Sequence, residues 1–190
     1  MARKFLAIPF TIKPIEVKSN DKNIMQETNK PTDSVTLFAE ELEKMYPYDL
    51  RAGGYTKIKP ARIENLYAEC FRKETTDADR IEYLRHITSL ARSGCQEHSE
   101  ENLFMDEISK LQTETYRKKN ADYGDSFKKS MDEDGLLVAK IRIGDKIRRI
   151  ESLLKKGGEA QVKDEKLQDT FLDLANYCVM TILWLKERNE

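Results

Sequence analysis

The segment from Glu165 to Leu185 constrains the fold more than any other part of the chain. It reads EKLQDTFLDLANYCVMTILWL and contains neither proline nor glycine, so it predicts one long α-helix. At 100° per residue, five of its side chains fall within one narrow stripe, and apolar side chains cover the rest of the circumference. A helix that is apolar on nearly all sides belongs in the middle of a helical bundle. The stripe consists of Glu165, Asp169, Asp173, Asn176 and Met180.

The acids of this stripe need a counter-charge. Three carboxylates on the interior face of a buried helix would repel one another and lose hydration unless a positive charge lies beside them. A divalent metal ion is the simplest source of that charge, and we interpret Asp169 and Asp173 as functional because apolar residues surround them. Glu165 has a second explanation, since an acid at the start of a helix also complements the helix dipole. Asn176 could simply form a hydrogen bond across the bundle.

The rest of the chain predicts more helices of the same bundle. At 190 residues it is long enough for one good hydrophobic core, and 35% charged residues with only 8 glycines favour helices with solvated outer faces. Residues 120–135 are predicted as a loop. The further predicted helices cover residues 34–46, 61–72, 77–92, 99–119 and 136–156, and Gly94 is expected to end the third of these.

The first part of the chain is the least regular. KFLAIPFTIKPIEV has β-branched and apolar residues that could form one or two short strands, interrupted by Pro9 and Pro14. We therefore predict an all-α fold with two parts. An N-terminal extension of unknown role covers residues 1–75, and a helical domain covers residues 76–190.

Composition excludes several classes of protein. A net charge of −1 argues against a general nucleic-acid binder, so no direct binding to nucleic acid is expected. Three widely spaced cysteines without a C-x-x-C motif are typical of reduced thiols in an intracellular protein. The apolar run ANYCVMTILWL is too short to span a bilayer, and no signal peptide is recognisable. We expect a cytoplasmic protein without membrane contacts.

A second charged stripe precedes the acidic one. Arg142, Asp145 and Arg149 share one helical face, with Lys146 beside it, and isoleucines form the opposite face. Twenty-four residues separate Asp145 from the first aspartate of the later stripe, enough for an antiparallel return. Asp145 could then face both aspartates of that stripe and help to bind Mg²⁺, which prefers oxygen ligands. Taken alone, Asp145 and Arg149 are better explained as an i,i+4 surface salt bridge.

A third segment, YRKKNADYGDSF, concentrates polar residues directly after a predicted helix. Gly124 lets the backbone turn tightly or approach a ligand, and Tyr123 or Phe127 could stack on a base. By its spacing alone, the segment is only a turn after the end of a helix. Its polar members include Lys119, Asn120, Asp122, Asp125 and Ser126.

Read together, the three segments carry a resemblance. The patterns K-N-x-D-Y-G-D-S-F, R-x-G-D-K-x-x-R-I and D-E-x-x-x-D-T-x-x-D-L-A-N-Y resemble the nucleotide-modification-associated family of phages and bacteria. That family is similar to the all-α, MazG-like nucleoside triphosphate pyrophosphatases. The resemblance covers roughly residues 105–185. It implies a helical bundle that works as an oligomer, a dimer or tetramer, and a Mg²⁺-dependent cleavage between the α- and β-phosphates, with Mn²⁺ as an alternative metal. A phage-encoded chain would act in the host cytoplasm.

The resemblance also implies roles for individual residues. Asp145, Asp169 and Asp173 would be catalytic. The same three aspartates and Glu165 would bind the metal. The substrate would contact Lys119, Asn120, Asp122, Tyr123, Ser126, Lys146, Arg149 and Asn176. The MazG pattern has two acids three residues apart on one helix and Glu-x-x-Asp on the next. The chain departs from both parts, because Arg142 stands where the first acid of the first pair is expected and the second pair is spaced as Asp169 and Asp173.

Three functions fit these observations. The leading hypothesis is a metal-dependent pyrophosphatase that converts a (deoxy)nucleoside triphosphate to its monophosphate and pyrophosphate, in nucleotide-pool control or in support of DNA modification. The alternative is a nucleotide-binding or sequestering protein without turnover. This alternative stays open because Arg142 stands where the pattern has an acid. A purely structural helical module is the third, and it leaves the predicted buried acids without a counter-charge.

Overall fold

The protein is all-α in the part that the structure describes. The structure is a computed structural model, and it describes residues 33–45, 59–101, 103–157 and 166–189. These ranges contain seven helices and no strand. The strands expected near the N-terminus lie outside the described residues. The helices are α1 (Ser34–Glu43), α2 (Pro60–Cys70), α3 (Asp77–Glu97), α4 (Met105–Tyr123), α5 (Ser126–Asp134), α6 (Leu136–Lys155) and α7 (Leu167–Glu187).

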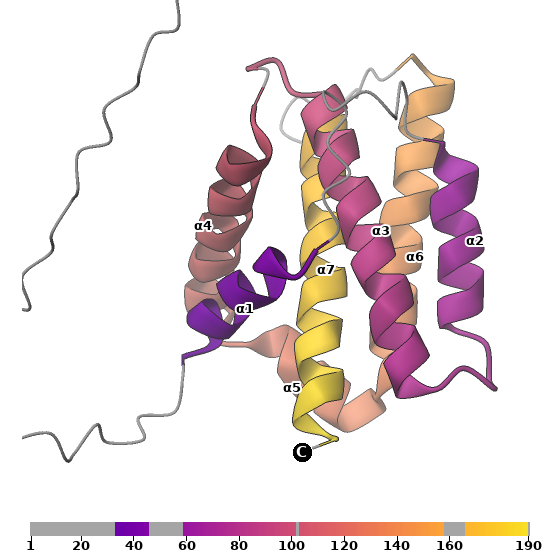
Figure 1. Ribbon diagram of the computed structural model, residues 1–190, viewed down its shortest axis with the longest axis vertical. Coiled ribbons are helices and arrows are strands. Elements are labelled where there is room, and N and C mark those ends of the chain that lie inside the picture. Colours follow the sequence, from indigo (N-terminus) through magenta and orange to yellow (C-terminus); the bar gives the residue numbers. More distant parts are fainter. Residues whose placement is uncertain (1–32, 46–58, 102, 158–165, 190) are drawn as a thin grey trace, which may run out of the picture. The chain divides into compact units, whose positions relative to one another are not determined.

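The predicted apolar helix is the centre of the bundle. Figure 1 shows α7 in the middle, with α4 and α1 on one side and α6 and α2 on the other, and α3 packs along its length. Phe171, Leu174 and Ile182 of α7 are completely buried. α1 and α2, which the sequence placed in the N-terminal extension, belong to the same compact unit as α3–α7. These two helices therefore contribute to the bundle, and the role of the residues before them stays open.

The end of α3 differs from the prediction. Gly94 does not end the helix, which continues to Glu97. A Cβ atom added at Gly94 would lie 2.5 Å from Cε1 of Phe171, so this glycine makes room for an aromatic ring of α7. The residue that looked like a helix stop is a packing position between α3 and α7.

The region around α4 also differs from the prediction. α4 begins at Met105 rather than near Ser99. At this start, the backbone N–H of Phe104 donates a hydrogen bond to Oε2 of Glu107 at 2.7 Å. Residues 126–134 form α5, although a loop was predicted there. Trp184 donates its indole N–H to Oδ1 of Asp132 at 2.8 Å, which ties this polar helix to α7. The local sequence contains few apolar residues, but Met131 of α5 is completely buried in the core.

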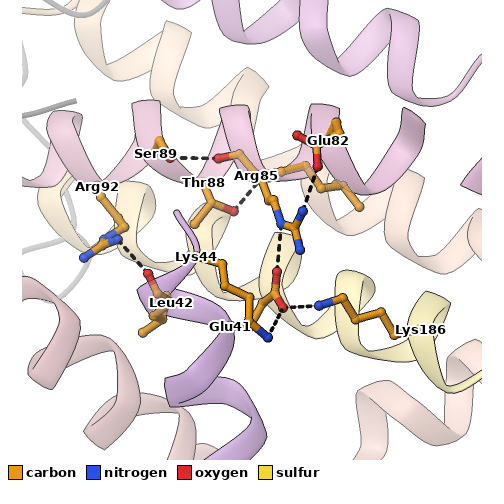
Figure 2. A network of polar contacts seen from close by, with 10 residues as sticks. Glu41, Leu42, Lys44, Glu82, Arg85, Thr88, Ser89, Arg92 and Lys186 are labelled. Atoms are coloured by element: carbon orange, nitrogen blue, oxygen red, sulfur yellow. Dashed lines mark hydrogen bonds and ion pairs between the residues drawn. The ribbon is translucent and has the colours of Figure 1, made fainter. Parts of the chain in front are cut away.

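A buried carboxylate holds α1 against the bundle (Figure 2). Glu41 is 1% exposed, and its Oε1 accepts a hydrogen bond from Nε of Arg85 at 2.9 Å. Its Oε2 forms ion pairs with Lys186 and, at 3.7 Å, with Lys44. The network joins α1 to α3 and α7 through one side chain. It also positions Phe38 of α1, whose ring stacks on Tyr116 of α4 at 4.3 Å.

The cysteines are buried thiols without disulfide bonds. Burial raises the pKa of Cys70 to about 12 and that of Cys95 to about 11, which keeps both thiols protonated at neutral pH. Among the described helices, none combines the length and the apolar character needed to cross a bilayer.

Candidate functional site

A sharp corner between α4 and α5 positions the first group of candidate residues. α4 ends at Tyr123 and is capped by Gly124, which has a left-handed backbone with φ of 57°, and Asp125 follows in the same conformation with φ of 58°. Glycine adopts this conformation freely, and aspartate is one of the few other residues that visit it routinely. α5 then starts at Ser126. The corner places Tyr123 and Phe127 at the wall of one cavity.

The cavity beside this corner, here called the aromatic pocket, has a volume of about 250 Å³. Aromatic side chains of α4, α5 and α7 form much of its wall. The rings of Phe127 and Tyr177 lie 5.3 Å apart, and Tyr116 is held by its stack on Phe38. Such rings offer flat faces on which a planar base can stack. The polar lining includes Lys119, Asn120, Ser126, Asp173 and Asn176.

A second cavity, the basic pocket, adjoins the first. Its volume is about 450 Å³, and α4, α6 and α7 line it. Lys119 and Asp173 line both pockets, so the two cavities meet at this ion pair. The charged lining of the basic pocket consists of Lys119, Lys146, Arg149, Asp169 and Asp173. Three cations against two acids give this lining a net positive charge.

Asp173 is the residue that joins the three helices at the site. Its Oδ1 accepts a hydrogen bond from Nζ of Lys119 at 2.7 Å, and its Oδ2 accepts one from Nζ of Lys146 at 2.8 Å. Burial raises the pKa of the Asp173 carboxyl, but the hydrogen bonds and charges of the two lysines outweigh burial and hold it below its usual value. The counter-charge that the sequence required is therefore supplied by two ammonium groups.

The depressed pKa of Asp173 predicts how the protein responds to acid. A carboxylate with a lowered folded-state pKa stabilises the fold above its unfolded pKa, and that stability is lost as the pH falls through the folded pKa. The difference in unfolding free energy between the wild type and Asp173→Asn should be constant from neutral pH down to about pH 5 and shrink below it. Urea unfolding at a series of pH values measures this difference. A difference that stays unchanged throughout the acid range would contradict the prediction.

The structure separates Asp145 from the other predicted ligands. Oδ1 of Asp145 pairs with Arg148 at 2.7 Å on the surface of α6, and the Asp145 side chain is 55% exposed. Asp145 lines neither pocket, whereas Lys146 and Arg149 line the basic one. Neighbouring residues of a helix point about 100° apart, so Asp145 and Lys146 cannot both face α7. The expected surface salt bridge exists, but its partner is Arg148 rather than Arg149.

The other predicted residues also have defined places. Asp169 lines the basic pocket but is exposed, and its Oδ2 accepts a hydrogen bond from the backbone N–H of Lys166 at 3.3 Å, at the start of α7. The stripe thus begins at the surface and becomes buried only towards Asn176, contrary to the expectation of an interior face. Asp122 is exposed and lines neither pocket. Glu165 lies outside the described residues.

The described side chains do not by themselves fit a magnesium ion. No group of three His, Cys, Asp or Glu side chains that could hold a metal occurs within the described ranges. Mg²⁺ requires near-octahedral oxygen coordination, whereas both carboxylate oxygens of Asp173 accept hydrogen bonds from ammonium groups. Magnesium binding stays a prediction from the sequence.

Some residues of the aromatic pocket were not predicted from the sequence. Tyr116 of α4 and Tyr177 of α7 line this pocket, and Gln112 of α4 donates a hydrogen bond to Asn176 in its wall. A signal for the two α4 residues was present, because Gln112, Tyr116, Lys119 and Tyr123 recur at spacings of four, three and four residues. That spacing places them on one face of a helix. Tyr177 had no such signal, since its contact with Phe127 depends on the position of α5.

The comparisons with known proteins concern the part of the chain that carries most of this site. Residues 119–185 match the family described as nucleotide modification associated domain 1. The matched segment contains Lys119, the corner between α4 and α5, all of α6 and most of α7. Neither the curated proteins nor the solved structures gave a match. Over residues 119–185, this chain is therefore similar to the nucleotide modification associated domain 1 family.

Proposed function

We propose that this protein binds a nucleotide, with the base in the aromatic pocket and the phosphates in the basic pocket. The observation that carries the proposal is that the two cavities adjoin and share Lys119 and Asp173. One ligand that is flat and uncharged at one end and polyanionic at the other would fit both cavities at once. The match to a family described by its association with nucleotide modification supports the same class of ligand.

The basic pocket has the chemistry of a phosphate site. Lys119 and Lys146 each donate to Asp173 in the structure, and phosphate oxygens would compete for the same ammonium protons. A triphosphate carries more negative charge than one carboxylate, so it would draw on both lysines and on Arg149 together. The guanidinium of Arg149 can offer two parallel N–H groups to phosphate oxygens. Asp173 would then act as an internal substitute for the phosphate when no nucleotide is bound.

Hydrolysis of the bound nucleotide is a second candidate function. The resemblance of the sequence motifs to MazG-like enzymes suggests cleavage of a nucleoside triphosphate to its monophosphate and pyrophosphate. The presence of Asp169 and Asp173 in the pocket proposed for the phosphates favours this candidate. The cations of the same pocket would neutralise charge on a departing pyrophosphate. A homo-oligomeric state and a cytoplasmic location belong to the same proposal, and the mass of the protein in solution tests the first.

Binding and hydrolysis are tested on the full chain with a panel of ribo- and deoxynucleoside triphosphates, each with and without Mg²⁺ or Mn²⁺. We expect at least one nucleotide to bind in calorimetric titration and to raise the melting temperature, because a ligand specific to the folded state stabilises it. Lys146→Ala should weaken binding by about 10- to 100-fold, as expected for the loss of a charged hydrogen bond. Chromatography of the incubated nucleotides shows whether monophosphate and pyrophosphate are released.

Lys140→Ala is the matched control. Lys140 is an exposed lysine on α6, the helix that also carries Lys146, and it lines neither pocket. Its removal should leave the affinity unchanged. If no nucleotide binds, or if both lysine variants lose affinity equally, the proposed function is wrong. Binding without products would exclude hydrolysis under these conditions and leave the binding proposal intact.

A further inference from the structure

One buried amide in the aromatic pocket has a fixed orientation and an unused donor. Asn176 of α7 is 5% exposed and lines the pocket. Its Oδ1 accepts a hydrogen bond from Nε2 of Gln112 on α4, at 3.1 Å. The Nδ2 group of Asn176 has no hydrogen-bond partner in the described part of the chain. The side chain therefore offers N–H donors to whatever fills the pocket.

Gln112 determines which end of the Asn176 amide faces the pocket. Gln112 is completely buried, and its Oε1 has no hydrogen-bond partner. Reversing both amides would keep one hydrogen bond between them but would leave both N–H groups of Gln112 unpaired, in place of its oxygen and one N–H. Buried unpaired N–H groups are rarer in proteins than under-satisfied oxygens. The arrangement with Gln112 as donor is thus the favoured one, and it turns Nδ2 of Asn176 outward.

We propose that Asn176 selects the base of the bound nucleotide and that Gln112 is the positioning residue for this selection. The inference rests on the proposed function, and it specifies the ligand further. Guanine, thymine and uracil carry a carbonyl oxygen where adenine and cytosine carry an amino group. The Asn176 donor can hydrogen-bond to that carbonyl, whereas an amino group would bring N–H against N–H. A site built around a buried hydrogen bond rejects the analogue that cannot form it.

The sharpest test compares nucleotides that differ at this group. Inosine triphosphate and adenosine triphosphate differ at position 6 of the purine, and uridine and cytidine triphosphates differ at position 4 of the pyrimidine. We expect the carbonyl-bearing member of a pair to bind about 10-fold more tightly to the wild type, as for one added hydrogen bond. Asn176→Asp replaces the donor by an acceptor and should abolish or reverse this preference. Because the added charge weakens all nucleotides alike, the affinity ratio within each pair is the quantity measured.

Gln112→Met provides a second variant that adds no charge. It keeps an unbranched side chain of similar length but removes the donor that orients Asn176, so the preference should decrease. Its affinity for inorganic triphosphate, which tests the basic pocket alone, should stay at the wild-type value. Asn65→Asp makes the same chemical change as Asn176→Asp at an exposed position of α2, and it should preserve the preference.

The outcomes separate this inference from the proposed function. Binding of nucleotides without a preference for carbonyl-bearing bases would overturn the inference and leave the nucleotide site standing. The same holds if Asn176→Asp and Gln112→Met both keep the wild-type ratio. If no nucleotide binds to the wild type, the proposed function and the inference both fail.

Discussion

Replacing Glu41 with alanine is expected to lower the free energy of unfolding by about 3–5 kcal/mol. Glu41 is 1% exposed and serves as the counter-ion of Arg85, Lys186 and Lys44. Removing the carboxylate takes from Arg85 and Lys186 the acid that they share, although Arg85 keeps its ion pair with Glu82 at 2.7 Å. Breaking a buried ion pair from one side is costly because an uncompensated charge remains. Urea unfolding, followed by circular dichroism, measures the loss.

Glu43 provides a matched control on the same helix. It is exposed, so Glu43→Ala should change the free energy of unfolding by no more than about 0.5 kcal/mol. Glu41→Gln keeps the size of the side chain and removes its charge, so we expect a loss smaller than that of the alanine variant. Equal losses in Glu41→Ala and Glu43→Ala would show that the network in Figure 2 does not hold α1 in place.

Replacing Gly94 with alanine is expected to destabilise the protein by about 1–3 kcal/mol, the usual cost of overpacking a core. Three ring atoms of Phe171 lie between 2.5 and 2.7 Å from the position of the added Cβ. In an exposed helix interior the same substitution would stabilise by about 1 kcal/mol, because alanine is the better helix former. The sign of the effect therefore depends on the contact between α3 and α7. Thermal and urea unfolding give the sign directly.

A double-mutant cycle identifies the cause of the Gly94 effect. Phe171→Leu removes the ring atoms that crowd the new methyl group, although it also costs stability by leaving a cavity. In that background, Gly94→Ala should be neutral or stabilising, which gives a large coupling energy between the two positions. If the alanine substitution costs the same with and without the ring, crowding against Phe171 is not the reason.

The helices whose own residues carry a clear apolar pattern could be predicted from the sequence. α6 and α7 lie within two residues of the predicted ranges, because apolar periodicity defines α6 and a long apolar run without proline or glycine defines α7. α5 and the last turn of α3 could not be predicted. α5 contains few apolar residues and buries Met131 in the core, and its Asp132 accepts a hydrogen bond from Trp184 of α7. α3 continues through Gly94, where Phe171 fills the space beside the glycine.

The candidate site could also be predicted only in part from the sequence. Lys119, Lys146, Arg149 and Asp173, all predicted from their motifs, meet in one cavity. Asp145 belongs to the same motif as Lys146 but faces away from that cavity. A motif records which residues occur together, whereas the rotation of α6 against α7 decides which of them share a cavity. That rotation depends on packing across the whole bundle.

The sequence by itself determined that an apolar helix with an acidic stripe lies at the centre of an all-α bundle and that its acids need a counter-charge. The tertiary structure decided what that counter-charge is. Lysines from α4 and α6, 54 and 27 residues away along the chain, donate to the two oxygens of Asp173. Helical periodicity is a local property that a sequence displays directly. The identity of a charge partner depends on how separate helices pack, and only the folded chain specifies it.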